Sequence, residues 1–152
     1  MATSIVKDVT IKTYSDDGHR KQVIALWESV FAYNAPHNGP ALSIDKKLEF
    51  NDGLFFVAVE GDVVVGTVMG GYDGHRGWIY SMAVAPAHRR KGVGAKLMAH
   101  AEQALIEKGC VKINLQILGG NESVVAFYEK LGYAVEQRVS MAKKISKNVP
   151  RT

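Results

Sequence analysis

Apolar side chains in the first half of the chain recur first at helical spacing and then in two dense runs. Residues 18–31 place apolar side chains three and four positions apart, which predicts an amphipathic helix. The two dense runs are separated only by Glu60-Gly61-Asp62, which predicts a β-hairpin. The elements expected in this half are a strand at 9–13, helices at 18–31 and 43–50, the second with Ser43 or Asp45 as its N-cap, and strands at 54–59 and 63–69.

The second half of the chain alternates between strand and helix patterns. Residues 78–84 are apolar at nearly every position, as in a strand covered on both faces, whereas residues 111–117 alternate apolar with polar side chains. A helix that joins two neighbouring strands usually makes them parallel, and hairpins are antiparallel, so we expect a mixed sheet. The elements expected here are a strand at 78–84, a helix at 93–108 ended by Gly109, a strand at 111–117, a helix that Asn121 begins and Gly132 ends, and a last strand at 133–141.

Composition places the chain among ordinary globular proteins. Its 152 residues are 47% hydrophobic and 22% charged, the size and balance of one domain that folds unaided. We expect a single domain over residues 1–152, with its core at about 9–145 and a basic tail at 146–152. No apolar run approaches the ~20 residues that span a bilayer and no signal-peptide pattern begins the chain, so a cytoplasmic location is expected. The single cysteine, Cys110, excludes an internal disulfide.

The net charge of +4 is unevenly distributed along the chain. Residues 81–101 hold four basic and no acidic residues, residues 137–152 hold five basic and none acidic, and the remainder holds 10 basic against 15 acidic residues. Concentrated charge on an otherwise mildly acidic chain indicates a localised anion site rather than a general polyanion surface. The basic C-terminal segment contains no aromatic residue for stacking on bases, which argues against nucleic-acid binding.

The stretch from Tyr80 to Gln103 is the most informative one for chemistry. An apolar strand runs into Arg89-x-x-Gly92-x-Gly94-Ala95 and then directly into a helix. Because the first N–H groups of a helix are unpaired and glycines let a ligand approach the backbone, this stretch predicts an anion cradle. The same residues also fit a plain glycine-rich turn with solvated basic side chains. Two other phosphate loops are excluded, since the chain holds no G-x-x-x-x-G-K-[ST] and no G-x-G-x-x-G after the first strand of a βαβ unit.

This stretch resembles motif A of the GCN5-related N-acetyltransferase (GNAT) family, whose [QR]-x-x-G-x-[GA] loop holds the pyrophosphate of acetyl-coenzyme A (acetyl-CoA). Met82-Ala83-Val84-x-Pro86 resembles the exit of the family's central strand, and residues 121–133 (NESVVAFYEKLGY) resemble its motif B. Within the family, residues 66–77 look like the bacterial YpeA-type acetyltransferases. The resemblance implies an α/β fold of mixed α+β character, with about four helices and a central mixed sheet of six to seven strands that splays between the fourth and fifth strands.

The resemblance also implies a site for acetyl-CoA as the acyl-donor substrate. Its pantetheine arm would pair with the backbone of Met82, Ala83 and Val84, where the family's strand bulges and splays from the next one. A bulge re-aims backbone N–H groups, which then polarise the thioester carbonyl. The pyrophosphate would lie on the motif A loop, made up of Arg89, Arg90, Lys91, Gly92, Val93, Gly94 and Ala95.

Two residues of motif B each have two interpretations. Asn121 would contact pantetheine in the family's manner, and it also suits a helix N-cap, two roles that do not exclude each other. Tyr128 matches the family's usual general acid, which delivers a proton to the departing thiolate. Its alternative role is that of a core tyrosine on the apolar stripe with Val124 and Leu131.

The sequence departs from a familiar pattern where a general base is expected. Some relatives place a glutamate five residues before the motif B asparagine, and this chain has Gln116 there. Glutamine cannot accept the proton, so the base is another group or a water relay, or none is needed for an amine that is already partly neutral. Residues considered for the base are Glu49, Asp73, His75 and Tyr80, and residues considered for the acceptor pocket are Trp27, Phe31, Tyr33, Asn34 and His37.

We therefore expect an acetyl-CoA-dependent N-acetyltransferase that moves the acetyl group to a primary amine of a small molecule or peptide. Direct attack in a ternary complex is the simpler mechanism, because Cys110 gives no sign of a covalent acyl intermediate. Gln116 keeps open an alternative, a sensor module that binds acyl-CoA without turnover. The expected partner is the amine acceptor, a homodimer is left open, and no metal, nucleic acid or membrane is expected.

Overall fold

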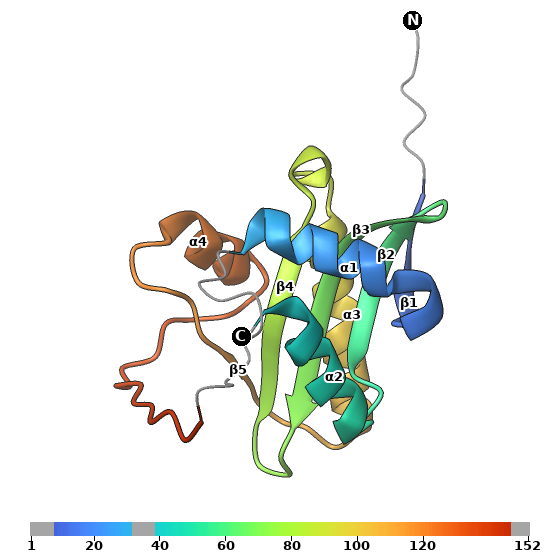
Figure 1. The fold of residues 1–152 in the computed structure, drawn as a ribbon. Helices are drawn as coiled ribbons and strands as arrows, with labels where there is room; N and C mark the ends of the chain where they lie inside the picture. Colours follow the sequence, from blue (N-terminus) through green and yellow to red (C-terminus); the bar gives the residue numbers. More distant parts are fainter. Residues whose placement is uncertain (1–7, 32–38, 147–152) are drawn as a thin grey trace, which may run out of the picture.

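The computed structural model describes residues 8–31 and 39–146, which form a sheet with helices on both faces (Figure 1). The strands are β1 (Val9–Thr13), β2 (Phe55–Glu60), β3 (Val63–Tyr72), β4 (Gly77–Val84) and β5 (Ile113–Leu115), in that order across the sheet. Neighbouring strands pair antiparallel from β1 to β4, and β4 pairs parallel with β5. The expected mixed sheet is confirmed, with its parallel pair where a helix joins the two strands.

Helices α1 (Asp16–Val30) and α2 (Pro40–Phe50) cover one face of the sheet, and α3 (Val93–Glu107) covers the other (Figure 1). Alternate side chains of β2 enter both layers: Phe56 packs in the cluster of Leu97 from α3, on one face. Val57 packs with Trp27 of α1 on the other face. A fully buried side chain of this size contributes about 1.5–3 kcal/mol, so both helical layers are held by burial. α4 (Glu122–Lys130) follows β5. Within the described ranges, none of the helices is long and apolar enough to cross a membrane.

The start of α2 differs from the prediction. The helix begins at Pro40, whose missing N–H breaks no hydrogen bond at a first helical position and whose fixed φ suits the helix. Gly39 occupies the N-cap position. Ser43 is buried inside the helix, and Asp45 accepts a hydrogen bond from Arg20 of α1 at 2.6 Å. The prediction of Ser43 or Asp45 as the N-cap is therefore wrong.

The sheet of the described residues has five strands, not the six to seven expected. The segment predicted as a last strand, 133–141, forms no ladder with β5. It contacts β5 and the residues that flank it through side chains instead: Asn114 Nδ2 of β5 lies 2.9 Å from Glu136 Oε1, and Gln116 Nε2, just after the strand, lies 2.7 Å from Ser140 Oγ. β5 is itself shorter than predicted, which leaves little regular backbone for another strand to pair with.

Candidate functional site

β4 carries one more residue than β3 at a single point. The register passes from Thr67 opposite Ala83 to Met69 opposite Tyr80, so three steps along β4 oppose two along β3. The extra residue is Ser81, whose φ of 51° lies in the left-handed region that L-residues rarely adopt. Because of this insertion, Tyr80 and Ala83 both face the layer of α1 and α2. The feature is a β-bulge, and the bulge implied by the family resemblance is present.

Because Ser81 has a positive φ, glycine should be more stabilising than valine at this position, the reverse of their order in an ordinary strand. We expect Ser81→Val to lower the free energy of unfolding by about 2 kcal/mol, because a β-branched side chain is strained at positive φ. Ser81→Gly should change it by less than about 1 kcal/mol, because glycine adopts this φ freely. Urea unfolding measures both variants. At an ordinary strand position valine stabilises more than glycine does. A valine variant at least as stable as the glycine variant would therefore contradict the bulge.

β4 also loses its parallel partner just before the bulge. Pairing with β5 covers three residue pairs and ends at Ile79 opposite Leu115. β4 then continues to Val84 with β3 as its neighbour in the sheet. Unpaired strand edges present backbone N–H and C=O groups to whatever lies alongside. We call residues Met82, Ala83 and Val84 the open edge of β4. The structure confirms the splay between the fourth and fifth strands.

The loop after the open edge turns the chain into α3. Arg90 and Gly92 have φ values of 64° and 82°, both in the left-handed region, and α3 begins at Val93. The first turn of a helix has N–H groups without intrahelical partners and carries the positive end of the helix dipole. The anion cradle predicted from the sequence therefore has a suitable backbone, placed directly after the open edge.

The basic side chains of this loop differ in their contacts. Arg89 Nε donates a hydrogen bond to the carbonyl oxygen of Val84 at 3.2 Å, which ties the loop to the end of β4. Arg90 and Lys91 are exposed, and neither forms an ion pair with a residue that the structure describes. Their charge is thus available to an anion at the N-terminus of α3.

Gly94 has a packing role in addition to its place in the anion cradle. A Cβ atom at this position would lie 2.9 Å from Cζ of Phe127 in α4, closer than side chains normally approach. Phe127 in turn contacts Tyr128, with ring centroids 4.9 Å apart and nearly perpendicular ring planes. The absent side chain of Gly94 therefore lets α4 approach α3 and helps to place Tyr128.

We expect Gly94→Ala to lower the free energy of unfolding by about 1 kcal/mol. The new methyl group would displace Phe127, a cost that exceeds the gain from alanine's better helix propensity. Gly18→Ala in α1 is the matched control, because a Cβ there meets nothing within 4 Å and the same propensity gain acts alone. Thermal and urea unfolding of both variants give the comparison. Equal stabilisation by the two changes would disprove the close contact of α3 with α4.

The two motif B residues are placed differently. Asn121 stands at the N-cap position of α4, but its side chain makes no cap hydrogen bond, and its Oδ1 accepts one from Ser123 at 3.3 Å. Tyr128 is 6% exposed, and burial raises its pKa to about 12. Its hydroxyl forms no hydrogen bond with any described residue. The side chain of Asn121 is thus exposed and does not cap the helix. Tyr128 is a core residue whose hydroxyl keeps its proton and can donate a hydrogen bond.

The residues considered for the base do not gather around the open edge. Asp73 and His75 lie in the turn that precedes β4, at the opposite end of that strand. The carboxylate of Asp73 accepts the N–H groups of His75 and Arg76, each at 2.7 Å, and these bonds lower its pKa. Glu49 is an exposed residue of α2, and Gln116 follows β5 with its amide bound to Ser140. These four residues thus lie in a turn or on the surface.

Tyr80 belongs to a buried polar cluster that the sequence did not reveal. Its hydroxyl accepts a hydrogen bond from Lys47 Nζ at 2.8 Å, and the same ammonium binds Asp52 Oδ2 at 2.9 Å and the carbonyl oxygen of Gly70. Lys47 is 7% exposed, although its place in a mixed polar helix gave no sign of burial. The cluster fastens α2 to β3 and β4, and it directs the Tyr80 hydroxyl to Gly70.

The residues considered for the acceptor pocket fall into two groups. Trp27 is fully buried in the core, and its indole Nε1 donates a hydrogen bond to Thr67 Oγ1 at 2.8 Å, so it does not line a pocket. Phe31 follows α1 and is half-buried. Tyr33, Asn34 and His37 lie outside the described residues.

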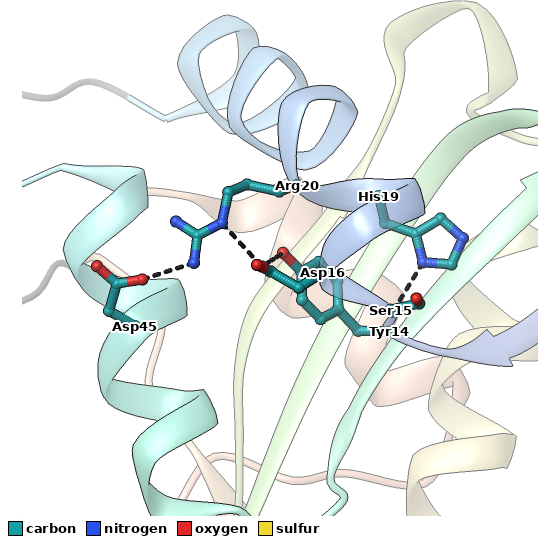
Figure 2. Close-up of polar contacts among 6 residues, drawn as sticks. All are labelled: Tyr14, Ser15, Asp16, His19, Arg20 and Asp45. Atoms are coloured by element: carbon teal, nitrogen blue, oxygen red, sulfur yellow. Dashed lines mark hydrogen bonds and ion pairs between the residues drawn. The ribbon is translucent and has the colours of Figure 1, made fainter.

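A surface cluster near the N-terminal end of α1 joins α1 to α2 (Figure 2). Arg20 stands at its centre, with Nε 2.8 Å from Asp16 Oδ1 and a terminal nitrogen 2.6 Å from Asp45 Oδ1. The hydroxyl of Tyr14 donates to the same Asp16 oxygen at 2.7 Å. Because these groups are exposed to solvent, which screens their charges, the ion pairs stabilise the fold only weakly. Of these contacts, the pair of Arg20 with Asp45 connects the two helices.

Comparisons with known proteins agree with this geometry. The model of the acetyltransferase (GNAT) family matches residues 20–133. An acetyltransferase of Sodalis glossinidius is 43% identical over 119 residues, which cover 78% of this chain and 83% of that protein. An aminoglycoside acetyltransferase from an uncultured soil metagenomic sample has a TM-score of 0.70 at 26% identity, covering 91% of this chain and 97% of its own.

A third neighbour shows the same fold at lower identity. It is AAC(6')-Iy in complex with the bisubstrate analogue CoA-S-monomethyl-acetylneamine, with a TM-score of 0.75 and 17% identity, covering 91% of this chain and 99% of its own. The similarity to the YpeA-type subgroup stays a prediction. The family model spans the bulged strand, the glycine loop and the helix that carries Tyr128, and this chain belongs to the acetyltransferase (GNAT) family.

Proposed function

We propose that this protein transfers the acetyl group of acetyl-CoA to a primary amine of a small molecule or peptide, by direct attack in a ternary complex. The observation that carries the proposal is the open edge of β4, which leads directly into the loop before α3. A strand edge pairs with an extended chain of amides, and a helix N-terminus binds a diphosphate. The pantetheine and pyrophosphate parts of acetyl-CoA present these groups in the same order. The CoA-derived analogue held by AAC(6')-Iy supports this choice of donor.

The residues of the chain fit such a donor. The backbone of Met82, Ala83 and Val84 would pair with the amides of pantetheine, where β5 leaves the edge open. The exposed Asn121 side chain is a further polar contact for the same arm. The pyrophosphate would lie on the N–H groups and basic side chains of the motif A loop, which are Arg89, Arg90, Lys91, Gly92, Val93, Gly94 and Ala95.

The transfer needs a polarised carbonyl and a stabilised leaving group. The amine nitrogen forms a bond to the thioester carbon, and the carbonyl oxygen takes up negative charge as the tetrahedral intermediate forms. Backbone N–H groups beside the bulge at Ser81 would stabilise that charge. Collapse of the intermediate breaks the C–S bond, and the Tyr128 hydroxyl donates a hydrogen bond to the departing sulfur. The amine gives up its extra proton to solvent or to a water relay.

The pKa values of the two groups favour a hydrogen bond from Tyr128 to the sulfur over complete transfer of its proton. With the pKa of Tyr128 at about 12 and that of an alkyl thiol at ~8.5, complete transfer to the thiolate is uphill by about 5 kcal/mol. For the amine, a pKa of ~10.4 requires about 4.6 kcal/mol to reach the neutral form at pH 7, against about 1.4 for a pKa near ~8. Because Gln116 cannot act as the base, acceptors with a low amine pKa are the favoured class.

The alternative function is an acyl-CoA sensor, which Gln116 in the glutamate position favours. The two functions differ in whether thiol is released. We would add acetyl-CoA to the protein with a panel of amines and follow free thiol, including aminoglycosides, amino acids, polyamines and peptides with free N-termini. The aminoglycoside arm follows from the soil enzyme of the same fold. Amine-dependent release supports the transferase, whereas tight acetyl-CoA binding with no release for any amine would favour the sensor.

A further inference from the structure

A buried chain of hydrogen bonds ends on the bulge residue of β4. The indole Nε1 of Trp27 donates to Thr67 Oγ1 at 2.8 Å, and Thr67 Oγ1 donates to the carbonyl oxygen of Ser81 at 2.9 Å. Trp27 and Thr67 are fully buried and Ser81 is 8% exposed. The chain links helix α1 to β4 through the side chain of a β3 residue.

The direction of both bonds is fixed by donor chemistry. An indole nitrogen can only donate, so the Thr67 oxygen must accept from Trp27. A threonine hydroxyl has one hydrogen, and with the oxygen engaged by Trp27 that hydrogen is directed to the Ser81 carbonyl. The hydroxyl is otherwise a free rotor. Trp27 therefore sets the orientation in which Thr67 binds the bulge.

The bulge needs such a partner. Ser81 is the inserted residue, with no single β3 residue opposite it in the register, so its carbonyl cannot be satisfied by the regular ladder. A non-glycine residue at positive φ is strained and persists only where its surroundings hold it. A buried carbonyl left without a hydrogen bond would add a second cost, the loss of its hydration. The Thr67 hydroxyl removes that second cost and favours the bulged conformation.

We propose that Trp27 and Thr67 are positioning residues that set the direction of the backbone groups at Met82 and Ala83. The inference rests on the proposed function, in which the backbone groups beside the bulge face the acetyl thioester and the adjoining pantetheine amides. The pyrophosphate cradle begins several residues later and has its own contacts, such as that of Arg89 with Val84. The pair should therefore affect recognition of the acyl group more than recognition of the rest of CoA, for which Val84, Asn121 and the motif A loop supply further contacts.

The test compares the affinity for acetyl-CoA with the affinity for free CoA, both by calorimetry without an amine. Thr67→Val keeps the side-chain shape but removes the hydroxyl, and Thr67→Ser restores it. Trp27→Phe removes the indole N–H together with part of the ring, so the loss of buried volume must be controlled for as well. Val23→Ala is the control, because it cuts a fully buried side chain from the same helix without touching the hydrogen bonds. The backbone amide resonances of residues 81–84 are recorded for each unliganded variant.

We expect Thr67→Val to reduce the preference for acetyl-CoA over CoA about tenfold, the effect of about 1.4 kcal/mol from one lost buried hydrogen bond. Trp27→Phe should reduce it about threefold, since the Thr67 hydroxyl remains but is free to rotate. Thr67→Ser and Val23→Ala should keep the wild-type preference. The amides of Met82 and Ala83 should shift in Thr67→Val and not in Val23→Ala.

Two results would overturn the inference. One is an unchanged preference in Thr67→Val while its affinities for acetyl-CoA and CoA fall together, as loss of folded protein alone would produce. The other is an amide spectrum of residues 81–84 in Thr67→Val that matches the control. If wild-type protein binds neither ligand, the proposed function fails. The backbone amide resonances of residues 81–84 then still decide whether the Thr67 hydroxyl controls the conformation of the bulge.

Discussion

Replacing Tyr128 by phenylalanine should lower the turnover of acetyl-CoA with an amine about a hundredfold and leave acetyl-CoA affinity within about twofold of wild type. A positioned general acid usually contributes about a hundredfold to ten-thousandfold in rate. The expected loss lies at the low end of this range because Tyr128, with its raised pKa, donates a hydrogen bond more readily than a whole proton. Affinity should be preserved because the hydroxyl acts on the sulfur only as the C–S bond breaks. Turnover by thiol release and affinity by calorimetry separate the two effects.

Tyr133→Phe is the matched control for this variant. The two rings are neighbours, with centroids 5.7 Å apart, but the hydroxyl of Tyr133 is bound to Glu102 at 2.6 Å. Its loss should reduce stability by about 1 kcal/mol and change turnover little. Equal loss of turnover in both variants would show that Tyr128 acts through packing. Unaltered turnover in Tyr128→Phe would remove the acid role.

The pH dependence gives an independent check on Tyr128. Because burial raises its pKa to about 12, the hydroxyl keeps its proton at every pH below about 11. The phenylalanine variant should therefore show the same rise of rate with pH as wild type, since that limb reports deprotonation of the amine. A wild-type fall in rate near pH 10 that the variant lacks would mean that Tyr128 titrates at its ordinary pKa.

The sequence pattern predicts those elements whose burial follows from the spacing of their own apolar side chains. The stripe that includes Leu97 and Leu105 predicted α3, and both residues are fully buried. The hairpin at Gly61 is predicted from two apolar runs separated by a short turn, and it is confirmed, with the φ of Gly61 at 61°. These features depend on local conformation and on one apolar face, which a sequence records directly.

The pattern failed where the outcome depends on a partner. Alternation at 133–141 predicted a last strand, but a strand needs an edge to pair with, and β5 is regular only over Ile113–Leu115. The burial of Lys47 depends on Asp52, Tyr80 and a carbonyl of β3, which are brought together only by the fold. No local feature distinguishes such a lysine from a solvated one.

The candidate site was predicted mostly through the family resemblance. Residues 78–84 read as an uninterrupted strand, and nothing in their composition marks Ser81 as an inserted residue. One signal was available, because Thr67 is the single polar side chain in the apolar run at 63–69. A buried threonine implies a hydrogen-bond partner, and here it has two, Trp27 and the Ser81 carbonyl. Which partners it finds depends on the packing of α1 over the sheet.

Arg90→Glu should weaken acetyl-CoA binding about thirtyfold, the largest effect expected from a single surface charge. The free arginine at the start of the cradle would be replaced by a carboxylate that repels the pyrophosphate, a change of about 2 kcal/mol at a partly solvated site. Lys144→Glu is the matched control, since it makes the same change in net charge on an exposed residue of the basic C-terminal segment. Calorimetry at low and high salt measures both, and the loss in Arg90→Glu should shrink as salt screens the charges.

Acetylpantetheine provides the sharper comparison, because it carries the acetyl thioester and the amide arm without the pyrophosphate. Arg90→Glu should leave the KM for acetylpantetheine unchanged while raising the KM for acetyl-CoA, which separates the cradle from the open edge of β4. A loss that is equal for the two donors would mean that Arg90 acts on the fold of the loop, where its φ is 64°. An equal loss in Lys144→Glu would mean that net charge alone, and not the position of Arg90 before α3, governs binding.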